Sequence, residues 1–361
     1  MAGSFWGRHA FSIGGVDFSW HDVVLAAMVR GEWSAFERRL AEGLACDARA
    51  RADDVLPSEE AIDEAATAFR YDRDLIAAAD VTAWLDRLAL SADEWGDYLR
   101  RDLLRRQVSN DLDDVLDRFA PSARNLVEAA VVDGICSGAF DAFEHAFAGR
   151  AALVFDTDAA RFRRVCEQCA AAASPDPLVA QLAHTHAHWL SIGDAGTATA
   201  RLSLVSELDA AFSTIADHIA ANGQLHSIID DNRLEWMRLE LETISFATES
   251  AAREAMLCMQ VDGLSLHDVG ALARRAVDRT VVALEDIDPQ RRERLISAEP
   301  GHAVGPMTVD GRFDVALLVS RTAPALSEPV IAARARALAV DRALRSAARD
   351  HVTRQTGSVP A

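Results

Sequence analysis

The apolar positions of this chain change their period in one stretch, residues 234–324. Leu239 to Glu242 alternate apolar and acidic side chains, as in a strand with one buried face. The apolar runs 304–309 and 313–319 flank Asp310-Gly311, a dipeptide that favours a two-residue hairpin turn. The remaining elements expected here are a strand at 280–284 and helices that begin at Thr248, Ser265 and Asp288. The pattern predicts an α+β domain with a small antiparallel sheet, in the order strand, helix, helix, strand, helix, strand, turn, strand.

One irregularity is expected inside the first strand of this domain. Beyond Thr243, the apolar side chains of Ile244 and Phe246 fall on the face that carries Glu240 and Glu242. Because side chains alternate between the two faces of a strand, this change of phase predicts a β-bulge at Thr243.

Outside this stretch the apolar spacing is mostly that of helices, so the fold class is mainly α. Ser58 precedes two glutamates and Ser91 stands three residues before Glu94, so both serines are predicted N-caps. Either a short hairpin or an extended entry segment is expected at 11–20, with a turn at Gly14-Gly15. The predicted regions are a helical N-domain at 1–120, a helical middle region and connector at 121–233, the α+β domain at 234–324 and a C-terminal helix at 325–361.

The C-terminal helix has a narrow apolar stripe. Its members are Val330, Ala333, Ala337, Val340 and Leu344. A stripe of this width does not hold an isolated helix together in water, so we expect the helix to pack into a groove elsewhere in the protein.

Composition and charge limit the classes of partner. The chain has no lysine, so its 37 basic residues are all arginine, and the net charge is −19. An acidic surface repels nucleic acid and anionic membranes, and neither is expected as a partner. No apolar run reaches the ~18 residues of a membrane span, no secretory signal is visible, and five cysteines suit a reducing compartment. We therefore expect a cytoplasmic protein. No phosphate-binding loop or serine-hydrolase elbow occurs, and no cofactor is expected.

A CxxC and a histidine cluster could form a metal site. Cys166 and Cys169 share one helix face, and His184 and His188 share another. One interpretation is a Cys₂His₂ zinc site that joins two helices. The other is a pair of partly buried cysteines and a polar histidine face, which we favour because the spacing departs from that of zinc fingers. The prediction is therefore no metal.

Four aromatic residues of the N-terminal region form the candidate peptide-binding group. Phe69, Trp84, Trp95 and Tyr98 could line a groove for a peptide. Large aromatic side chains at helical spacing are more often members of a helical core, so both interpretations stay open.

Five segments resemble, in chain order, the parvulin-type prolyl isomerases and chaperones of the SurA, PrsA and PpiC group. They are VLPSEEAIDEA at 55–65, LSADEWGDYLRRDLLRR at 90–106, DGLSLHDVGALA at 262–273, SAEPGHAVGPM at 297–307 and DGRFDVALLV at 310–319. The resemblance implies a SurA-like helical N-domain that the C-terminal helix returns to complete, joined to a parvulin-like domain. It extends to the putative peptide maturation system group, proposed to accompany ribosomally made peptide natural products.

The catalytic positions of the family are changed in this chain. Where parvulins place histidines, the corresponding residues are Thr243 on the first strand and Asp314 on the last, and the glycine-rich loop is missing. By the same resemblance, Met307 belongs to the site, and Phe246 and Phe313 are added to the peptide-binding candidates. The domain is thus expected to be a degenerate parvulin that binds chain segments.

Three functions follow as hypotheses. The first is a chaperone-like protein that holds an unfolded or precursor peptide, with no catalysis. The second is an active peptidyl-prolyl cis-trans isomerase whose rebuilt site uses Thr243, Asp314 or Met307. The third is a scaffold subunit that has a peptide-modifying enzyme as its partner.

Overall fold

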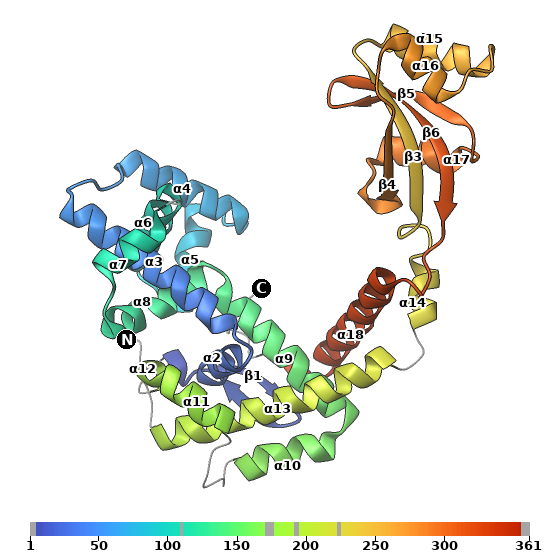
Figure 1. The fold of residues 1–361 in the computed structure, drawn as a ribbon. Helices are drawn as coiled ribbons and strands as arrows, with labels where there is room; N and C mark the ends of the chain where they lie inside the picture. The colour runs from blue at the N-terminus through green and yellow to red at the C-terminus, as the bar shows by residue number, and fades with distance from the viewer. Residues whose placement is uncertain (1–4, 109–110, 170–176, 191–194, 222–224, 355–361) are drawn as a thin grey trace. The chain divides into compact units, whose positions relative to one another are not determined.

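The computed structural model describes residues 5–108, 111–169, 177–190, 195–221 and 225–354 (Figure 1). Within these residues the fold is mainly helical with two small antiparallel sheets, which confirms the predicted class. The chain divides into two compact units, residues 1–217 with 342–361, and residues 218–341. No described helix is long and apolar enough to cross a membrane.

The first unit begins with the predicted hairpin. Strands β1 (His9–Ile13) and β2 (Val16–Ser19) turn at Gly14 and Gly15, whose φ angles of 57° and 85° favour glycine. Strand β7 (Val352–Thr353) pairs with β1, so the sheet order is β2-β1-β7. The last described residues of the chain therefore complete a sheet that its first residues begin.

Helices make up the rest of the first unit. They are α2 (Trp20–Val29), α3 (Glu32–Ala52), α4 (Glu59–Asp72), α5 (Ala78–Leu88), α6 (Ala92–Gln107), α7 (Leu112–Phe119), α8 (Ala123–Cys136), α9 (Ala139–Thr157), α10 (Ala159–Cys169), α11 (Pro177–Thr185), α12 (Ala187–Leu190) and α13 (Ala195–Ala221). Their core is aromatic: Phe140 is fully buried and its ring lies within 6.4 Å of the rings of Trp20, Trp33 and Phe36. Stacked and edge-on rings of this kind bury large apolar areas in the core of the unit.

The predicted N-caps of α4 and α6 are present. The Ser58 hydroxyl accepts a hydrogen bond from the Ala61 amide at 3.2 Å. Ser91 and Glu94 form a capping box, in which the Glu94 carboxylate accepts from the Ser91 amide at 2.8 Å and the Ser91 hydroxyl accepts from the Glu94 amide at 3.2 Å. These caps set where the two helices begin, and so where their aromatic side chains lie.

The second unit contains the predicted α+β fold. A four-stranded sheet has the order β4 (Asp278–Ala283), β3 (Arg238–Phe246), β6 (Arg312–Thr322) and β5 (Ala303–Val309), with every pair antiparallel (Figure 1). The other elements are α14 (Leu225–Asp231), α15 (Glu249–Gln260), α16 (Leu266–Ala273), a short 3₁₀ turn (Leu284–Asp286) and α17 (Pro289–Ser297). From β3 to β6 the element order is the one predicted, with the hairpin turn at Asp310-Gly311.

The expected bulge at Thr243 is wrong. Pairing of β3 with β6 runs without interruption from Leu241 to Phe246, and the irregularity lies between Glu240 and Leu241. The change of phase has a different cause, because the sheet is covered on both faces. Leu239 and Leu241 pack in the cluster that includes α17, whereas Ile244 and Phe246 pack beneath α15 and α16. The first half of β3 thus buries its odd-numbered residues against one face of the sheet, and the second half buries its even-numbered residues against the other.

The predicted stripe of the C-terminal helix α18 (Pro329–His351) is wrong for its first three members, whereas Val340 and Leu344 are partly buried. Val330 is 76% exposed, and Ala333 and Ala337 are exposed as well. The buried face of the first part of α18 is formed by Ile331, Ala335 and Ala339, which pack on Trp236 and α14 in the second unit. The sequence offers two alanine-rich stripes on this helix, and only the identity of the packing partner selects between them.

The end of α18 belongs to the first unit. His351 lies 2.8 Å from the Asp156 carboxylate through Nε2. Beyond the helix, Arg354 donates two hydrogen bonds, at 3.0 and 3.1 Å, to the buried carboxylate of Glu144 on α9. The predicted α+β domain at 234–324 lies inside the second unit, which also takes in α14 and the first part of α18.

Candidate functional site

The four predicted aromatic residues of the N-terminal region lie together in the first unit. The ring of Phe69 on α4 is centred 5.6 Å from that of Trp84 on α5, 5.6 Å from that of Trp95 and 6.2 Å from that of Tyr98, the last two on α6. Trp84 and Tyr98 are buried, whereas Phe69 and Trp95 are partly exposed. The group thus serves in part as core and in part as surface.

A cleft of about 710 Å³ opens beside these rings. Phe69, Trp84 and Tyr98 line it, and Trp95 packs on Phe69 without lining it. Leu99 and Leu103 of α6 extend the apolar wall. The volume falls within the range of roughly 300–1,000 Å³ that is usual for ligand sites.

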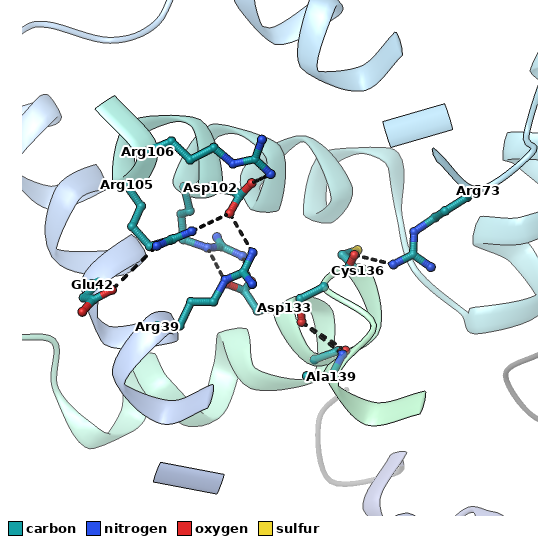
Figure 2. Close-up of polar contacts among 12 residues, drawn as sticks. Arg39, Glu42, Arg73, Asp102, Arg105, Arg106, Asp133, Cys136 and Ala139 are labelled. Atoms are coloured by element: carbon teal, nitrogen blue, oxygen red, sulfur yellow. Dashed lines mark hydrogen bonds and ion pairs between the residues drawn. The ribbon is translucent and has the colours of Figure 1, made fainter. Parts of the chain in front are cut away.

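Arg73 connects α4, α5 and α8 at the cleft. As the C-cap of α4, it places its guanidinium 4.7 Å from the ring centroid of Phe69 and 5.6 Å from that of Trp84. Its Nη2 donates a 2.6 Å hydrogen bond to the carbonyl oxygen of Cys136 at the end of α8 (Figure 2). A cation over aromatic faces is attracted by the ring quadrupoles, and the attraction grows as water is removed.

The segment that joins α4 to α5 is fixed by Arg70. Its Nε donates to the Leu75 carbonyl at 3.2 Å, and its Nη2 donates to the Ile76 carbonyl at 2.6 Å. Asp74 has a positive φ of 55°, which reverses the chain directly after α4. This reversal brings Trp84 back against Phe69.

The carboxylate of Asp102, which lines the cleft from α6, forms ion pairs with three guanidinium groups. It lies 3.0 Å from Arg39, 3.4 Å from Arg105 and 2.6 Å from Arg106 (Figure 2). Arg39 comes from α3 and the other two from α6, so the cluster ties these helices together. The negative charge of Asp102 is more than compensated by its neighbours.

A buried ion pair lies between α6 and α8, in a small pocket that shares Arg39, Tyr98 and Asp102 with the cleft. Arg101 of α6 and Asp133 of α8 are 7% and 8% exposed, and the guanidinium donates to both carboxylate oxygens. Burial raises the pKa of the Asp133 carboxyl, and the Arg101 guanidinium opposes that shift. The pair joins α6 to α8, and removing either partner would leave an uncompensated buried charge.

The phenol of Tyr98 and the thiol of Cys136, both beside the cleft, stay protonated at neutral pH. Desolvation raises the pKa of the Tyr98 phenol to about 12, and it raises that of the Cys136 thiol to about 12. A thiol of this kind is a poor nucleophile, because the thiolate is the reactive form. These two groups can therefore contribute contacts and donated hydrogen bonds, and their pKa values do not suit covalent chemistry.

The parvulin-site counterparts lie on the sheet of the second unit, on one face. The register pairs Asp314 with Ser245 of β3 and with Met307 of β5, whereas Thr243 pairs with Ala316. Asp314 is buried and accepts a 2.6 Å hydrogen bond from the Ser245 hydroxyl. Arg291 of α17 lies 3.9 Å from its other oxygen.

Sequence reasoning missed Ser245 and Arg291 at this cluster. The hairpin turn fixes the register of β5 with β6, but the register of β3 with β6 joins residues 69 positions apart and has no local signal. Phe246 and Phe313 pair with each other and pack into the cluster beneath α15 and α16.

The predicted metal ligands are described only in part. Cys166 on α10 is partly buried and His184 on α11 is exposed. The side chains of Cys169 and His188 lie outside the described residues. Among the described residues, no three His, Cys, Asp or Glu side chains are placed to hold a metal ion.

Comparison of the chain with protein-family models, with curated proteins and with solved structures finds no match.

Proposed function

We propose that this chain is a chaperone-like peptide-binding protein that holds an unfolded or precursor segment in the α4–α6 cleft. The observation that carries the proposal is the cleft itself, in which Phe69, Trp84 and Tyr98 form an apolar wall of an open cavity of about 710 Å³. Aromatic side chains supply large contact areas at low conformational cost, which suits the recognition of flexible chains. The neutral thiol of Cys136 beside this wall supports binding over covalent catalysis.

We further infer that the second unit is a degenerate parvulin-like domain and that the helical unit resembles the N-domain of SurA-like chaperones. The order of strands and helices from β3 to β6 supports the first part. Pairing of β7 with β1 supports the second, since it brings the C-terminal end of the chain to the helical unit. A peptide-modifying enzyme as partner would fit a role in peptide maturation.

Peptide binding can be measured by the fluorescence anisotropy of labelled, extended peptides that carry aromatic and aliphatic residues. Wild-type protein should bind a subset of them, and Phe69→Ala should weaken binding by about tenfold or more, because it removes the central ring of the wall. Phe119→Ala is the matched control, since Phe119 is a partly buried phenylalanine of the same unit that does not line the cleft. The proposal fails if no peptide binds, or if both variants weaken binding equally.

Prolyl isomerisation is the second candidate function, and the hydrogen bond between Ser245 and Asp314 favours it. A buried carboxylate held by a hydroxyl and near Arg291 is a polar network of the kind that could ease rotation about an amide bond. A proline-peptide isomerisation assay tests it. Turnover well above the uncatalysed rate, lost in Asp314→Asn, would make the protein an isomerase.

A further inference from the structure

The cleft is cationic in a chain that is strongly acidic. Four arginines and three aspartates line it, whereas the net charge of the chain is −19. One of these aspartates, Asp102, is already held by Arg39, Arg105 and Arg106. Four arginines against three aspartates leave the lining with a net positive charge, which favours an anionic ligand.

Among the arginines that line the cleft, Arg73 and Arg87 form no ion pair in the described part of the chain, and Arg73 is the one whose guanidinium lies over the aromatic rings. In the described part of the chain no carboxylate lies within ion-pair distance of its guanidinium, whereas Arg39 and Arg106 both pair with Asp102. Its hydrogen bond goes to the neutral carbonyl of Cys136. A guanidinium has five N–H donors in a fixed fork, so donors remain for a planar two-oxygen acceptor.

Asp141 of α9 acts on Arg73 electrostatically, without an ion pair between the two side chains. Its electrostatic interaction with Arg73 lowers the pKa of the carboxyl, while burial raises it more strongly. Asp141 therefore moderates the charge of Arg73 without occupying its donors.

Tyr98 supplies a second donor in the same cleft. It lines the cavity, is 7% exposed, and its hydroxyl makes no hydrogen bond to another described residue. Desolvation keeps the phenol protonated, because it raises the pKa of Tyr98 to about 12. A neutral phenol donates to a carboxylate, as a phenolate could not.

We propose that the α4–α6 cleft selects peptides that carry a carboxylate next to apolar residues, with Arg73 as the bidentate partner and Tyr98 as a further donor. The apolar side chains would contact Phe69 and Trp84, and the carboxylate would take the open edge of the guanidinium that lies over those rings. The inference rests on the proposed function, since it names the class of peptide that the same site takes. The carboxylate can come from an internal acidic residue or from the end of a chain.

Three short labelled peptides of alanine, leucine and phenylalanine separate these cases. The first has one central glutamate and blocked termini, the second has glutamine in its place, and the third is the glutamine peptide with a free C-terminal carboxylate. Wild-type protein should bind the first, the third or both about tenfold more tightly than the second. Which of the two gains affinity identifies the source of the carboxylate.

Arg73→Gln should remove this preference, so that the carboxylate peptides and the neutral peptide bind this variant with affinities within about twofold of one another, whatever the affinity common to all three. Arg118→Gln is the control, since Arg118 is an exposed arginine of the same unit that does not line the cleft. Tyr98→Phe should reduce the preference without abolishing it, and this variant keeps the test open if Arg73→Gln does not fold.

The two failures are distinguishable. If wild-type protein binds all three peptides equally, the carboxylate preference is refuted and peptide binding stands. If it binds none of them or of the wider peptide set, the proposed function fails as well. A preference that survives Arg73→Gln in folded protein would refute the role of Arg73.

Discussion

The guanidinium of Arg73 lies 4.7 Å from the ring centroid of Phe69, four positions earlier in the chain. The same guanidinium donates to the backbone of Cys136, so one side chain connects the end of α4 to the end of α8. This contact matters because α4 contributes no buried residue to the unit. The wall of the cleft that α4 forms is therefore held by a few side chains, chiefly Phe69 and Arg73.

We expect α4 to open more readily than the core helices. Local stability follows buried contacts, and α9 has ten buried residues where α4 has none. Backbone amides of residues 59–72 should therefore exchange with solvent deuterium faster than those of 139–157. A bound peptide should slow exchange in α4 more than in α7, which lies outside the cleft. Equal protection of α4 and α9 in the free protein would contradict this.

The Asp141 carboxyl should make stability depend on pH between about 4 and 6. Burial raises its pKa from 3.8 to about 6 in the folded protein. The native state then holds a proton that the unfolded chain has released, so stability falls as pH rises through this window and is level above it. Asp141→Asn removes the titration. The variant should be more stable than wild type at pH 7, by roughly 1 kcal/mol after allowance for solvent screening.

Urea unfolding at pH 4 and pH 7 measures this difference for both proteins. The difference in the free energy of unfolding between the variant and wild type should be small at pH 4 and larger at pH 7. Asp117→Asn, at an exposed position on α7, serves as the control substitution. A difference that is the same at both pH values would show that the effect of Asp141→Asn is unrelated to its titration.

Gly134 of α8 should not tolerate a side chain. A Cβ at this position would lie 2.3 Å from the ring of Phe140, which is fully buried in the aromatic core. Gly134→Ala should therefore destabilise the protein by about 1–3 kcal/mol, because the ring must leave its position. Gly96→Ala is the matched control in the interior of α6, where a Cβ would meet no atom within 4 Å. That change should stabilise the protein by up to ~1 kcal/mol. Thermal unfolding compares the two, and equal effects would refute the packing argument.

Local signals were sufficient for much of this fold. The capping box at Ser91, the turn at Asp310-Gly311 and the order of elements from β3 to β6 depend on neighbouring residues, and each could be predicted. Phe69 and Arg73 stand four residues apart, a spacing that places them on one helix face. Their shared role at the cleft could have been inferred, but the contact of Arg73 with Cys136 could not, since it joins residues 63 positions apart.

The errors arose where one element has two possible partners. Thr243 looked irregular because the burial pattern of a strand with one covered face was applied to a strand with two. The stripe of α18 was misplaced because Ile331, Ala335 and Ala339 are as apolar as the predicted set, and contact with Trp236 decides between them. In both cases tertiary packing supplied information that periodicity alone lacks.

The hydrogen bond between Ser245 and Asp314 should stabilise the sheet of the second unit. Asp314 is 6% exposed and the bond is 2.6 Å long, so removing either partner leaves a polar group in a largely apolar layer beside Met307. A hydrogen bond to a charged group contributes about 1.5–3 kcal/mol. In a double-mutant cycle of Ser245→Ala and Asp314→Ala, we expect a coupling energy of that size in the free energy of unfolding.

A second serine–carboxylate contact between the same two strands provides the comparison for this cycle. The Ser320 hydroxyl donates to Glu240 at 2.9 Å, but that carboxylate lies toward solvent and is shared with Arg279. Its coupling should be clearly smaller, because water and Arg279 can replace the serine. If the two cycles give equal coupling, burial does not strengthen the Ser245–Asp314 bond. If the Asp314 coupling is large while Asp314→Asn folds and isomerises proline peptides at the wild-type rate, Asp314 acts in the second unit as a structural residue of the sheet.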